Sequence, residues 1–395
     1  MLKSEDYLPY AKPFIGEEEL LEVIDTLNSG WLSRGPKCAL FEERFASFVG
    51  SKFAVAVNSC TAGMFLALKA MEIGPGDEVI TSPLTFAATA NVVVHTGAVP
   101  VFADICPKTL NIHPDEIAQK ISPRTKAILP VHYAGRACEM DRILELAATH
   151  GLKVLEDAAH AVYTRYKDRM VGSIGDATAF SFYVTKNLST GEGGMLTTDD
   201  AELAHKVRLL SLHGMDTDAW KRYTAKGSWY YRVLLPGYKF NMTDLQASLG
   251  LRQLERLADM QRIREEYARA YNEGLKGLDG IILPCADEEG RHAWHLYVVQ
   301  IDEKQAGLSR QMFIEELRRK GIGTSVHFIP VHLHPYYATA YGYKEGDFPA
   351  AEGAYQKLVS LPLYPKMTRD DVGKVINAVR EILPKHTGMA GKVHP

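Results

Sequence analysis

The chain has 395 residues, of which 46% are hydrophobic and 24% are charged, and its net charge at pH 7 is −3. These values are ordinary for a globular protein of two domains and give no sign of attraction to nucleic acid or to a membrane surface. No apolar run reaches the roughly 18 residues of a membrane span, and the first residues lack the apolar segment of a secretion signal, so we expect a cytoplasmic protein without a nucleic-acid partner.

The first part of the chain is expected to hold one helix and a loop. Residues 17–28 have apolar side chains at helical spacing, and residues 29–36 (Ser-Gly-Trp-Leu-Ser-Arg-Gly-Pro) follow as a loop that carries Trp31. Composition alone favours packing for this tryptophan, although it could line a pocket.

Between residues 53 and 198, short apolar runs alternate with helical patterns. We expect seven strands, at residues 53–57, 78–82, 99–103, 126–131, 153–156, 177–182 and 194–198. Helical patterns lie between them, including residues 61–71, a helix that ends at 91–96, and residues 139–150. Strands that alternate with helices need crossover connections, which predicts an α/β fold with a mainly parallel seven-stranded sheet covered on both faces.

The chain changes character after Asp244. Residues from 244 to about 275 form a long, charged amphipathic pattern, typical of a helix that links two domains. A strand at 295–301 and helices at 309–320 and 368–383 follow, which indicates a smaller α/β domain. We therefore predict a large domain at 1–255, a small C-terminal domain at 256–385 and a flexible tail at 386–395.

The junction after the first strand is a candidate anion site. Ligands collect at the carboxyl ends of the strands in an open α/β sheet, and the segment Asn58-Ser-Cys-Thr-Ala-Gly63 lies at such an end. Backbone N–H groups and the helix dipole would suit a phosphate there. Ordinary N-capping by Ser59 or Thr61 explains the same residue types equally well.

Three further polar residues lie at or near strand ends. Asp157 ends an apolar strand, and its carboxylate needs a cationic partner, such as a protonated ring nitrogen, if it is partly buried. Ser181 alternates with Phe180 and Phe182, so its hydroxyl points away from their rings. His160 could lie against the same ligand as Asp157, or it could be a hydrogen-bonded structural histidine.

Lys186 follows an apolar run and precedes a polar, glycine-rich turn. A lysine placed this way can be desolvated, which lowers its pKa and makes it a nucleophile toward a carbonyl; a solvated loop lysine is the alternative. With the anion site, Ser181 and Asp157, this lysine matches the needs of pyridoxal phosphate (PLP), which requires an amine, a carboxylate for the ring nitrogen and a phosphate nest. Phe86, just after the second strand, is placed to cover the ring.

The sequence contains neither a metal-binding pattern nor a dinucleotide fingerprint. The five cysteines are odd in number and form no C-x-x-C pair, which argues against disulfides and structural zinc. His327, His332 and His334 lack an associated carboxylate or cysteine, so we expect no metal. The turn at residues 191–194 lacks the G-x-G-x-x-G spacing.

Ordered matches over nearly the whole chain resemble one family of enzymes. They are Ser29-Gly-Trp-Leu-Ser-Arg-Gly-Pro36, Ser59-Cys-Thr-Ala-Gly63, Gly76-Asp-Glu-Val-Ile80, Pro130-Val-His-Tyr-Ala-Gly135, Glu156-Asp-Ala-Ala-His-Ala161, Thr185-Lys-Asn-Leu-Ser-Thr-Gly-Glu-Gly-Gly194, Gly237-Tyr-Lys-Phe-Asn-Met-Thr-Asp-Leu-Gln246 and Gly321-Ile-Gly-Thr-Ser-Val-His-Phe328. In these segments the chain resembles the PLP-dependent sugar aminotransferases of the DegT/DnrJ/EryC1/StrS family. The resemblance implies the aspartate aminotransferase-like fold, PLP-dependent fold type I.

The resemblance also implies roles for residues at the motif positions. Lys186 would be the Schiff-base lysine, Asp157 the partner of the pyridine nitrogen, and His160 a neighbour of the ring's phenolic oxygen, while Phe86 would stack on the ring. The phosphate would be held by Cys60, Thr61 and Ser181, with Asn241 reaching in from a second subunit, so a homodimer with shared active sites is implied. The nucleotide-sugar pocket would be lined by Tyr10, Trp31, Leu32, Ser33 and His327.

The activity implied is transfer of the amino group of L-glutamate to the keto carbon of a nucleoside-diphosphate 4-keto sugar, in polysaccharide biosynthesis. Residues 292–297 and 321–328 are most similar to the enzyme that makes a UDP-linked amino arabinose, which favours UDP and C4. The alternatives are a PLP-dependent sugar dehydratase, a C3 aminotransferase of a dTDP or GDP sugar, and a regulator that binds ligand without turnover. Dehydratase relatives have histidine in place of the lysine, so Lys186 favours transamination.

Overall fold

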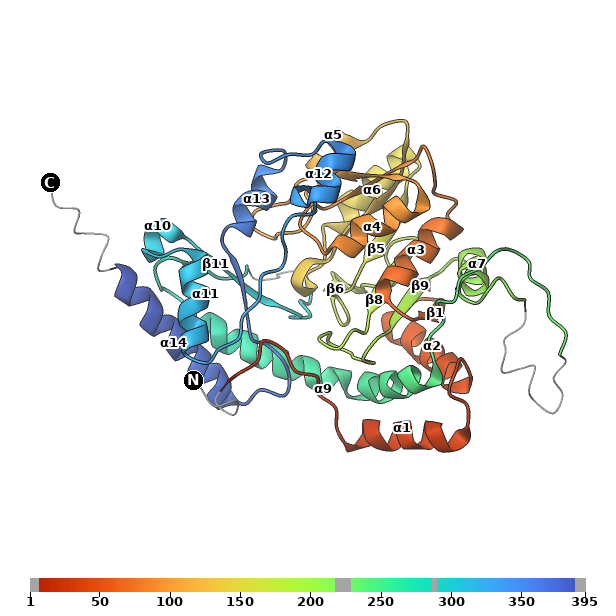
Figure 1. The fold of residues 1–395 in the computed structure, drawn as a ribbon, viewed down its shortest axis with the longest axis horizontal. Coiled ribbons are helices and arrows are strands. Elements are labelled where there is room, and N and C mark those ends of the chain that lie inside the picture. The colour runs from red at the N-terminus through yellow and green to blue at the C-terminus, as the bar shows by residue number, and fades with distance from the viewer. Residues whose placement is uncertain (1–6, 217–228, 286–289, 388–395) are drawn as a thin grey trace.

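A seven-stranded sheet forms the centre of the large domain (Figure 1). The computed structural model describes residues 7–216, 229–285 and 290–387. The strands are β1 (Phe53–Val57), β2 (Glu78–Thr81), β3 (Val99–Phe102), β4 (Thr125–Leu129), β5 (Lys153–Asp157), β8 (Ala177–Ser181) and β9 (Gly194–Thr198). Their order is β1-β9-β8-β5-β4-β2-β3, and only β9 runs antiparallel to its neighbours. The predicted mainly parallel sheet is therefore confirmed.

In every strand of this sheet except β3, alternate residues pack into two separate cores, one on each face of the sheet. In β5, for example, Val154 belongs to one core and Leu155 to the other. One face is covered by α3 (Cys60–Ala70), α4 (Ala87–Thr96) and α7 (Ala201–Ser211). The other is covered by α2 (Pro36–Val49), α5 (Pro114–Lys120), α6 (Met140–His150) and the start of α9 (Asp244–Leu275). Both faces are apolar because both are covered, as the continuous hydrophobic strands predicted.

The 32-residue helix α9 joins the two parts of the molecule. Leu251 and Leu257, in its first half, pack into the large-domain core, whereas Tyr267 and Tyr271 pack into a second core. The helix begins with a capping box between Thr243 and Gln246. It runs without a break through residue 255, where we placed the domain boundary, so that division stays a prediction.

The second core belongs to a small antiparallel sheet and its helices. The sheet contains β10 (Ile281–Ile282), β11 (Tyr297–Ile301) and β12 (Leu358–Leu361). It is accompanied by α10 (Glu303–Ala306), α11 (Arg310–Arg319) and α14 (Arg369–Thr387). Residues 386 and 387 of the predicted tail thus belong to α14, and residues 388–395 lie outside the described residues. Within the described ranges, no helix combines the length and apolarity needed to cross a membrane.

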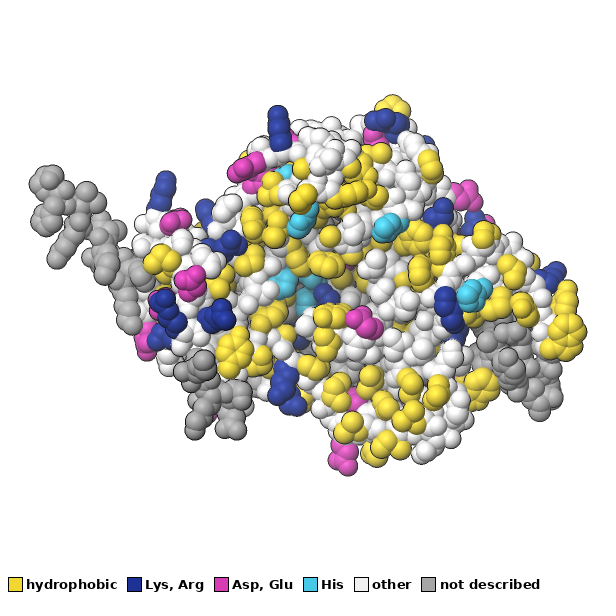
Figure 2. Space-filling model, viewed as in Figure 1, with side chains coloured by type: hydrophobic (Ala, Val, Ile, Leu, Met, Phe, Trp, Pro, Cys, Tyr) yellow, Lys and Arg dark blue, Asp and Glu magenta, His cyan; other side chains and the backbone are white. Residues whose placement is uncertain are grey.

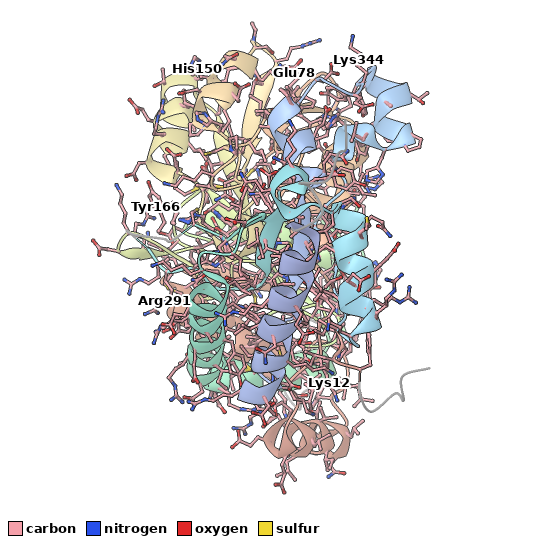
Figure 3. The ribbon with its side chains drawn as sticks, turned by 90° about the vertical axis from the view of Figure 1, so that its left-hand side faces the viewer. Lys12, Glu78, His150, Tyr166, Arg291 and Lys344 are labelled. Atoms are coloured by element: carbon pink, nitrogen blue, oxygen red, sulfur yellow. The ribbon has the colours of Figure 1, made fainter. Side chains whose placement is uncertain are left out.

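One C-terminal segment folds back onto the large domain, which the sequence pattern did not predict. It contains η3 (Val331–Leu333), α12 (Pro335–Tyr341) and α13 (Pro349–Tyr355). The backbone N–H of Val331 donates to the Pro83 carbonyl over 2.8 Å, and the N–H of Ala350 donates to the Asp104 carboxylate over 2.8 Å. In Figure 3, Lys344 of this segment and Glu78 of β2 accordingly lie at the same end of the molecule. The hairpin β6 (Arg165–Tyr166) and β7 (Arg169–Met170) is a further unpredicted element.

Candidate active site

A cavity of about 530 Å³ opens at the carboxyl ends of the central strands. It receives Cys60 and Thr61 from the start of α3, Asp157 from the end of β5, Ser181 from the end of β8, and Lys186 from the loop after β8. In Figure 2, histidine and basic side chains are visible in a hollow near the middle of this face. The four predicted strand-end signals thus line one cavity.

The start of α3 forms the anion-binding end of the cavity. The Ser59 hydroxyl accepts a hydrogen bond from the N–H of Ala62 over 3.1 Å, so the serine caps the helix as the alternative interpretation expected. The cap leaves Cys60 and Thr61 on the cavity wall. A Cβ on Gly194 would lie 2.5 Å from the backbone carbon of Ser59, so glycine is required where β9 passes this helix start. Ser59 can therefore cap α3 while the start of the same helix binds an anion.

Asp157 is buried and held by neutral groups. Its Oδ2 accepts a hydrogen bond from the Thr89 hydroxyl over 2.8 Å, and its Oδ1 accepts one from the N–H of Ala159 over 3.0 Å. The structure gives it no ion pair with a described lysine, arginine or histidine. A buried carboxylate in this state favours a cationic partner such as a protonated ring nitrogen.

Lys186 reaches the cavity with one polar side-chain contact, to His295. Its Nζ lies 3.5 Å from His295 Nε2 and forms no ion pair within the described part of the chain. Burial lowers the pKa of Lys186 to about 8, although Asp157 and Cys60 oppose that shift. With this pKa, about a tenth of the amine is neutral, and nucleophilic, at pH 7 and about half at pH 8.

Three histidines surround the lysine. The ring centres of His160 and His295 are 4.5 Å apart, and those of His160 and His327 are 6.5 Å apart. Burial lowers the pKa of all three, with the charge of Lys186 adding to the effect, so they are neutral at physiological pH. His160 Nδ1 accepts a hydrogen bond from the N–H of Ala134 over 3.3 Å, which places its hydrogen on Nε2.

Aromatic side chains frame the cavity mouth. Phe86 is 63% exposed there, and its ring centre lies 5.9 Å from that of Phe328. Tyr10 lies 5.5 Å from His327 between ring centres, and both line the cavity. Phe86 thus has the free face that the predicted stacking role needs.

Four of the predicted site residues lie outside this cavity. Trp31, Leu32 and Ser33 do not line it, and neither does Asn241, whose amide binds the Met242 carbonyl and the Lys239 ammonium. The Ser33 carbonyl accepts the N–H of Asp244, so the segments around residues 33 and 244 lie side by side. One chain alone does not bring them to Lys186.

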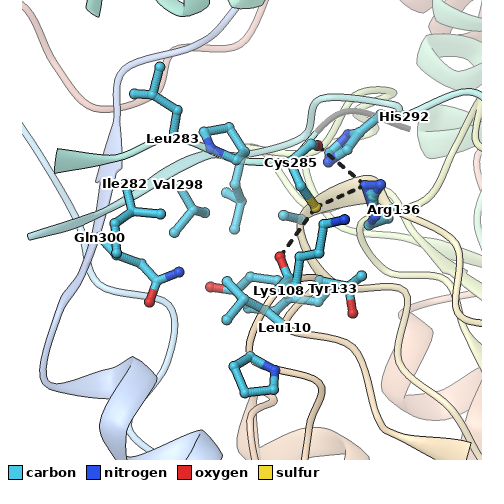
Figure 4. A pocket seen from close by; sticks show the side chains of 15 residues that line it. Lys108, Leu110, Tyr133, Arg136, Ile282, Leu283, Cys285, His292, Val298 and Gln300 are labelled. Atoms are coloured by element: carbon cyan, nitrogen blue, oxygen red, sulfur yellow. Dashed lines mark hydrogen bonds between the residues drawn. The ribbon is translucent and has the colours of Figure 1, made fainter. Parts of the chain in front are cut away.

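A second cavity, of about 220 Å³, is lined by Tyr133 and Ala134, among other residues (Figure 4). The Arg136 guanidinium there donates to the Cys285 carbonyl and lies 3.3 Å from its sulfur, and the Cys285 thiol donates to the Lys108 carbonyl. This cavity is smaller, and neither Lys186 nor the start of α3 lines it. The larger cavity is therefore the candidate active site.

The larger cavity fits pyridoxal phosphate. The cofactor needs three groups, and the cavity has them: a lysine with a lowered pKa, a buried carboxylate without an ion pair to a described residue, and the start of a helix with Cys60 and Thr61 on the cavity wall. The described residues hold no cluster of three or more histidine, cysteine or acidic side chains suited to a metal ion. Sequence reasoning gave no role to His295 or Asn187, although the match at residues 185–194 included the asparagine.

Comparisons with known proteins agree with this geometry. The sequence pattern of the DegT/DnrJ/EryC1/StrS aminotransferase family matches residues 13–380. Spore coat polysaccharide biosynthesis protein SpsC of Bacillus subtilis is 64% identical over 382 residues, which cover 96% of this chain and 98% of that protein. Among solved structures, the putative sugar aminotransferase Spr1654 from Streptococcus pneumoniae, in its PMP form, is 34% identical with a TM-score of 0.89, covering 96% of this chain and 99% of that one. Helicobacter pylori PseC, an aminotransferase of pseudoaminic acid biosynthesis, is 30% identical with a TM-score of 0.89, covering 96% and 100%.

Proposed function

The chain belongs to the DegT/DnrJ/EryC1/StrS family of PLP-dependent sugar aminotransferases, and we propose that it moves the amino group of L-glutamate to C4 of a UDP-linked 4-keto sugar. We place this reaction in polysaccharide biosynthesis, as the name of the Bacillus subtilis relative supports. The observation that carries the proposal is a lysine with a lowered pKa beside a buried carboxylate and an anion cradle.

Lys186 and Asp157 divide the proton chemistry between them. When bound, PLP supplies a ring that accepts electrons from the substrate carbon. Asp157 would hold the proton on the ring nitrogen, and the neutral Lys186 Nζ would take the proton from Cα of glutamate. In the second half of the cycle the same Nζ delivers a proton to the sugar carbon that receives nitrogen. Because the Lys186 amine acts first on glutamate and then on the sugar, we expect ping-pong kinetics.

The remaining cavity residues bind and orient. Cys60, Thr61 and Ser181 would hold the phosphate at the start of α3. His160, with its hydrogen on Nε2, is suited to donate to a phenolic oxygen, and Phe86 offers an exposed aromatic face to the ring.

A second subunit completes the proposed site. Asn241 does not line the cavity of its own chain, so it would serve the cavity of a partner. Exposed apolar residues on two segments of the chain support a homodimer. They are Leu20, Leu21, Ile24 and Leu27 on α1 (Glu17–Ser29), and Trp229, Tyr230, Tyr231, Val233 and Leu234.

The sugar nucleotide would enter over Tyr10 and His327. His327 Nδ1 lies 2.8 Å from the Ser360 hydroxyl, which fixes the imidazole beside the Tyr10 ring. Trp31, Leu32 and Ser33 would join this pocket across the dimer interface. UDP and C4 are favoured by the match at residues 292–297 and 321–328; C3 of a dTDP or GDP sugar is the second choice.

A panel of sugar nucleotides tests the proposal. The purified enzyme is incubated with L-glutamate and UDP-, dTDP- or GDP-linked 3-keto or 4-keto sugars, and products are analysed by mass spectrometry and NMR. We expect 2-oxoglutarate and a 4-amino sugar, fastest from a UDP-linked substrate. Deoxygenated product without consumption of glutamate would establish a dehydratase, and binding without any product would establish a sensor.

A further inference from the structure

The imidazole of His295 bridges the side chains of two consecutive residues. Its Nε2 lies 3.5 Å from Lys186 Nζ, and its Nδ1 lies 3.1 Å from Asn187 Oδ1. The asparagine is held in turn, because its Nδ2 donates to the Ala293 carbonyl over 2.7 Å. Lys186, Asn187 and His295 therefore form one connected unit.

This connection fixes which imidazole nitrogen carries the hydrogen. A backbone carbonyl only accepts, so the Asn187 group facing Ala293 is the amide nitrogen, and the group facing His295 is the oxygen. That oxygen also only accepts, so His295 Nδ1 must donate to it. In the neutral ring Nε2 is then bare, and it presents a lone pair to Lys186 Nζ.

The surroundings keep His295 neutral. Burial lowers the pKa of His295, and the positive charges of Lys186 and Arg264 add to that effect. The other titratable groups facing it are His160 and His327, both also with lowered pKa values. None of these neighbours is a carboxylate that would favour an imidazolium.

We propose that Asn187 and His295 are positioning residues that aim the amine of Lys186, by offering it a bare imidazole nitrogen. This inference rests on the proposed function, in which the Lys186 amine moves the substrate proton. The lysine would give one N–H to His295 Nε2, which leaves its own lone pair directed into the cavity. The distance of 3.5 Å is long, as such contacts often are before substrate binds.

The first experiment measures the pKa of Lys186 in cofactor-free protein, without any substrate. The rate of acetylation of Lys186 by acetic anhydride is followed against pH by mass spectrometry of its peptide. The His295→Phe variant should lower the pKa of Lys186 by about one unit, because the ammonium loses its acceptor. Asn187→Leu should lower it by less, and His295→Gln, which keeps an acceptor, should restore part of it.

The second experiment uses the reconstituted enzyme and L-glutamate alone. We expect His295→Phe to slow the glutamate half-reaction about tenfold, with the KM for glutamate nearly unchanged. The pH at which this half-reaction reaches its plateau should shift to lower values, by the same amount as the pKa of Lys186 in the first experiment. Failure of every sugar in the panel would reject the proposed function yet leave both of these measurements intact.

His292→Gln is the matched control. His292 is buried in the same segment, its Nδ1 accepts the Trp294 N–H over 2.8 Å, and it lines the smaller cavity. This variant should leave the pKa of Lys186 unchanged. NMR of isotope-labelled histidine in the wild-type protein checks the tautomer without any substitution. Hydrogen on Nε2 of His295, or an unchanged pKa of Lys186 in folded His295→Phe, would overturn the proposal.

Discussion

Two neighbouring residues of β5, Glu156 and Asp157, enter opposite regions of the molecule. Glu156 binds His132 Nε2 over 2.8 Å, the Thr178 hydroxyl over 2.7 Å and the N–H of Gly175 over 2.8 Å. Both Glu156 and His132 are fully buried, and the remaining nitrogen of His132 accepts the N–H of Cys138. This Glu156 region is a closed network that leaves nothing for a ligand to bind.

The Asp157 region is built in the opposite way. Its carboxylate, the Lys186 amine and three neutral histidines surround a cavity, and the lysine forms no ion pair within the described residues. Burial lowers the pKa of Lys186 and of the three histidines, and the cavity leaves these side chains an open face. The difference shows that burial of polar groups marks a reactive site only where their bonding is incomplete.

Loss of Lys186 should have the largest effect on activity. We expect Lys186→Ala to reduce turnover about 10⁴-fold or more and to abolish the visible absorbance of lysine-bound cofactor, without lowering the melting temperature. Absorbance, turnover and thermal melting measure these three properties. Lys153→Ala, at an exposed lysine paired with Asp176, is the control and should change none of them. Retained absorbance in Lys186→Ala would show that another lysine binds the cofactor.

Loss of Glu156 should instead lower the stability of the fold. Glu156→Ala leaves His132, Thr178 and Gly175 without their shared acceptor, so we expect a loss of about 3–5 kcal/mol in unfolding free energy by urea titration. Asp157→Ala should keep its stability and lose activity. If the two variants behaved alike, the contrast between the regions would be false.

The pH dependence of stability also distinguishes the Glu156 region from the Asp157 region. Burial raises the pKa of Glu156, but hydrogen bonds from His132, Gly175 and Thr178 outweigh it and hold that pKa below its usual value. The stability this carboxylate contributes is present above its unfolded pKa and lost as pH falls through its folded one. Glu156→Gln should therefore flatten the acid limb of stability against pH.

Capture of the cofactor should depend on pH through Lys186. Only the neutral amine attacks an aldehyde, so the capture rate of cofactor-free protein should rise about tenfold per pH unit and level off above the pKa. Stopped-flow absorbance measures the rate. We expect the plateau to begin near a pKa of about 8, whereas a plateau near 10.5 would indicate a solvated lysine.

We expect the smallest effect, on cofactor affinity, from loss of Asn241. Asn241→Ala should weaken cofactor binding by about threefold to tenfold through loss of one hydrogen bond, with the fold intact. Equilibrium dialysis gives the affinity, and analytical ultracentrifugation checks the oligomeric state. An unchanged affinity in a variant that still dimerises would contradict the shared site.

The sequence predicted the parts of the fold that depend on local patterns. Each central strand is a short apolar run, and the ends of those runs gave Asp157, Ser181 and Lys186. The return of residues 331–355 to the large domain was missed because short helices carry little hydrophobic periodicity. The reversed direction of β9 was missed for a similar reason, since periodicity carries no information on strand direction.

The histidine beside Lys186 could not be found from local patterns either. His295 is 109 residues from Lys186, and it reaches the lysine through a segment in which Trp294 has a φ of 47°. The N–H of Ala293 donates to the Gly135 carbonyl, and that of Leu296 donates to the Ala134 carbonyl. These two hydrogen bonds hold the segment that carries His295 in place. Only tertiary structure brings the two side chains together.

The helix α9 has a consequence for how the protein unfolds. Its first half is part of one core and its second half part of another, with no break between them. Loss of either core would expose apolar side chains of the same helix and weaken the other. The two cores should therefore melt in a single cooperative transition, with the slowest-exchanging amides in the middle of α9.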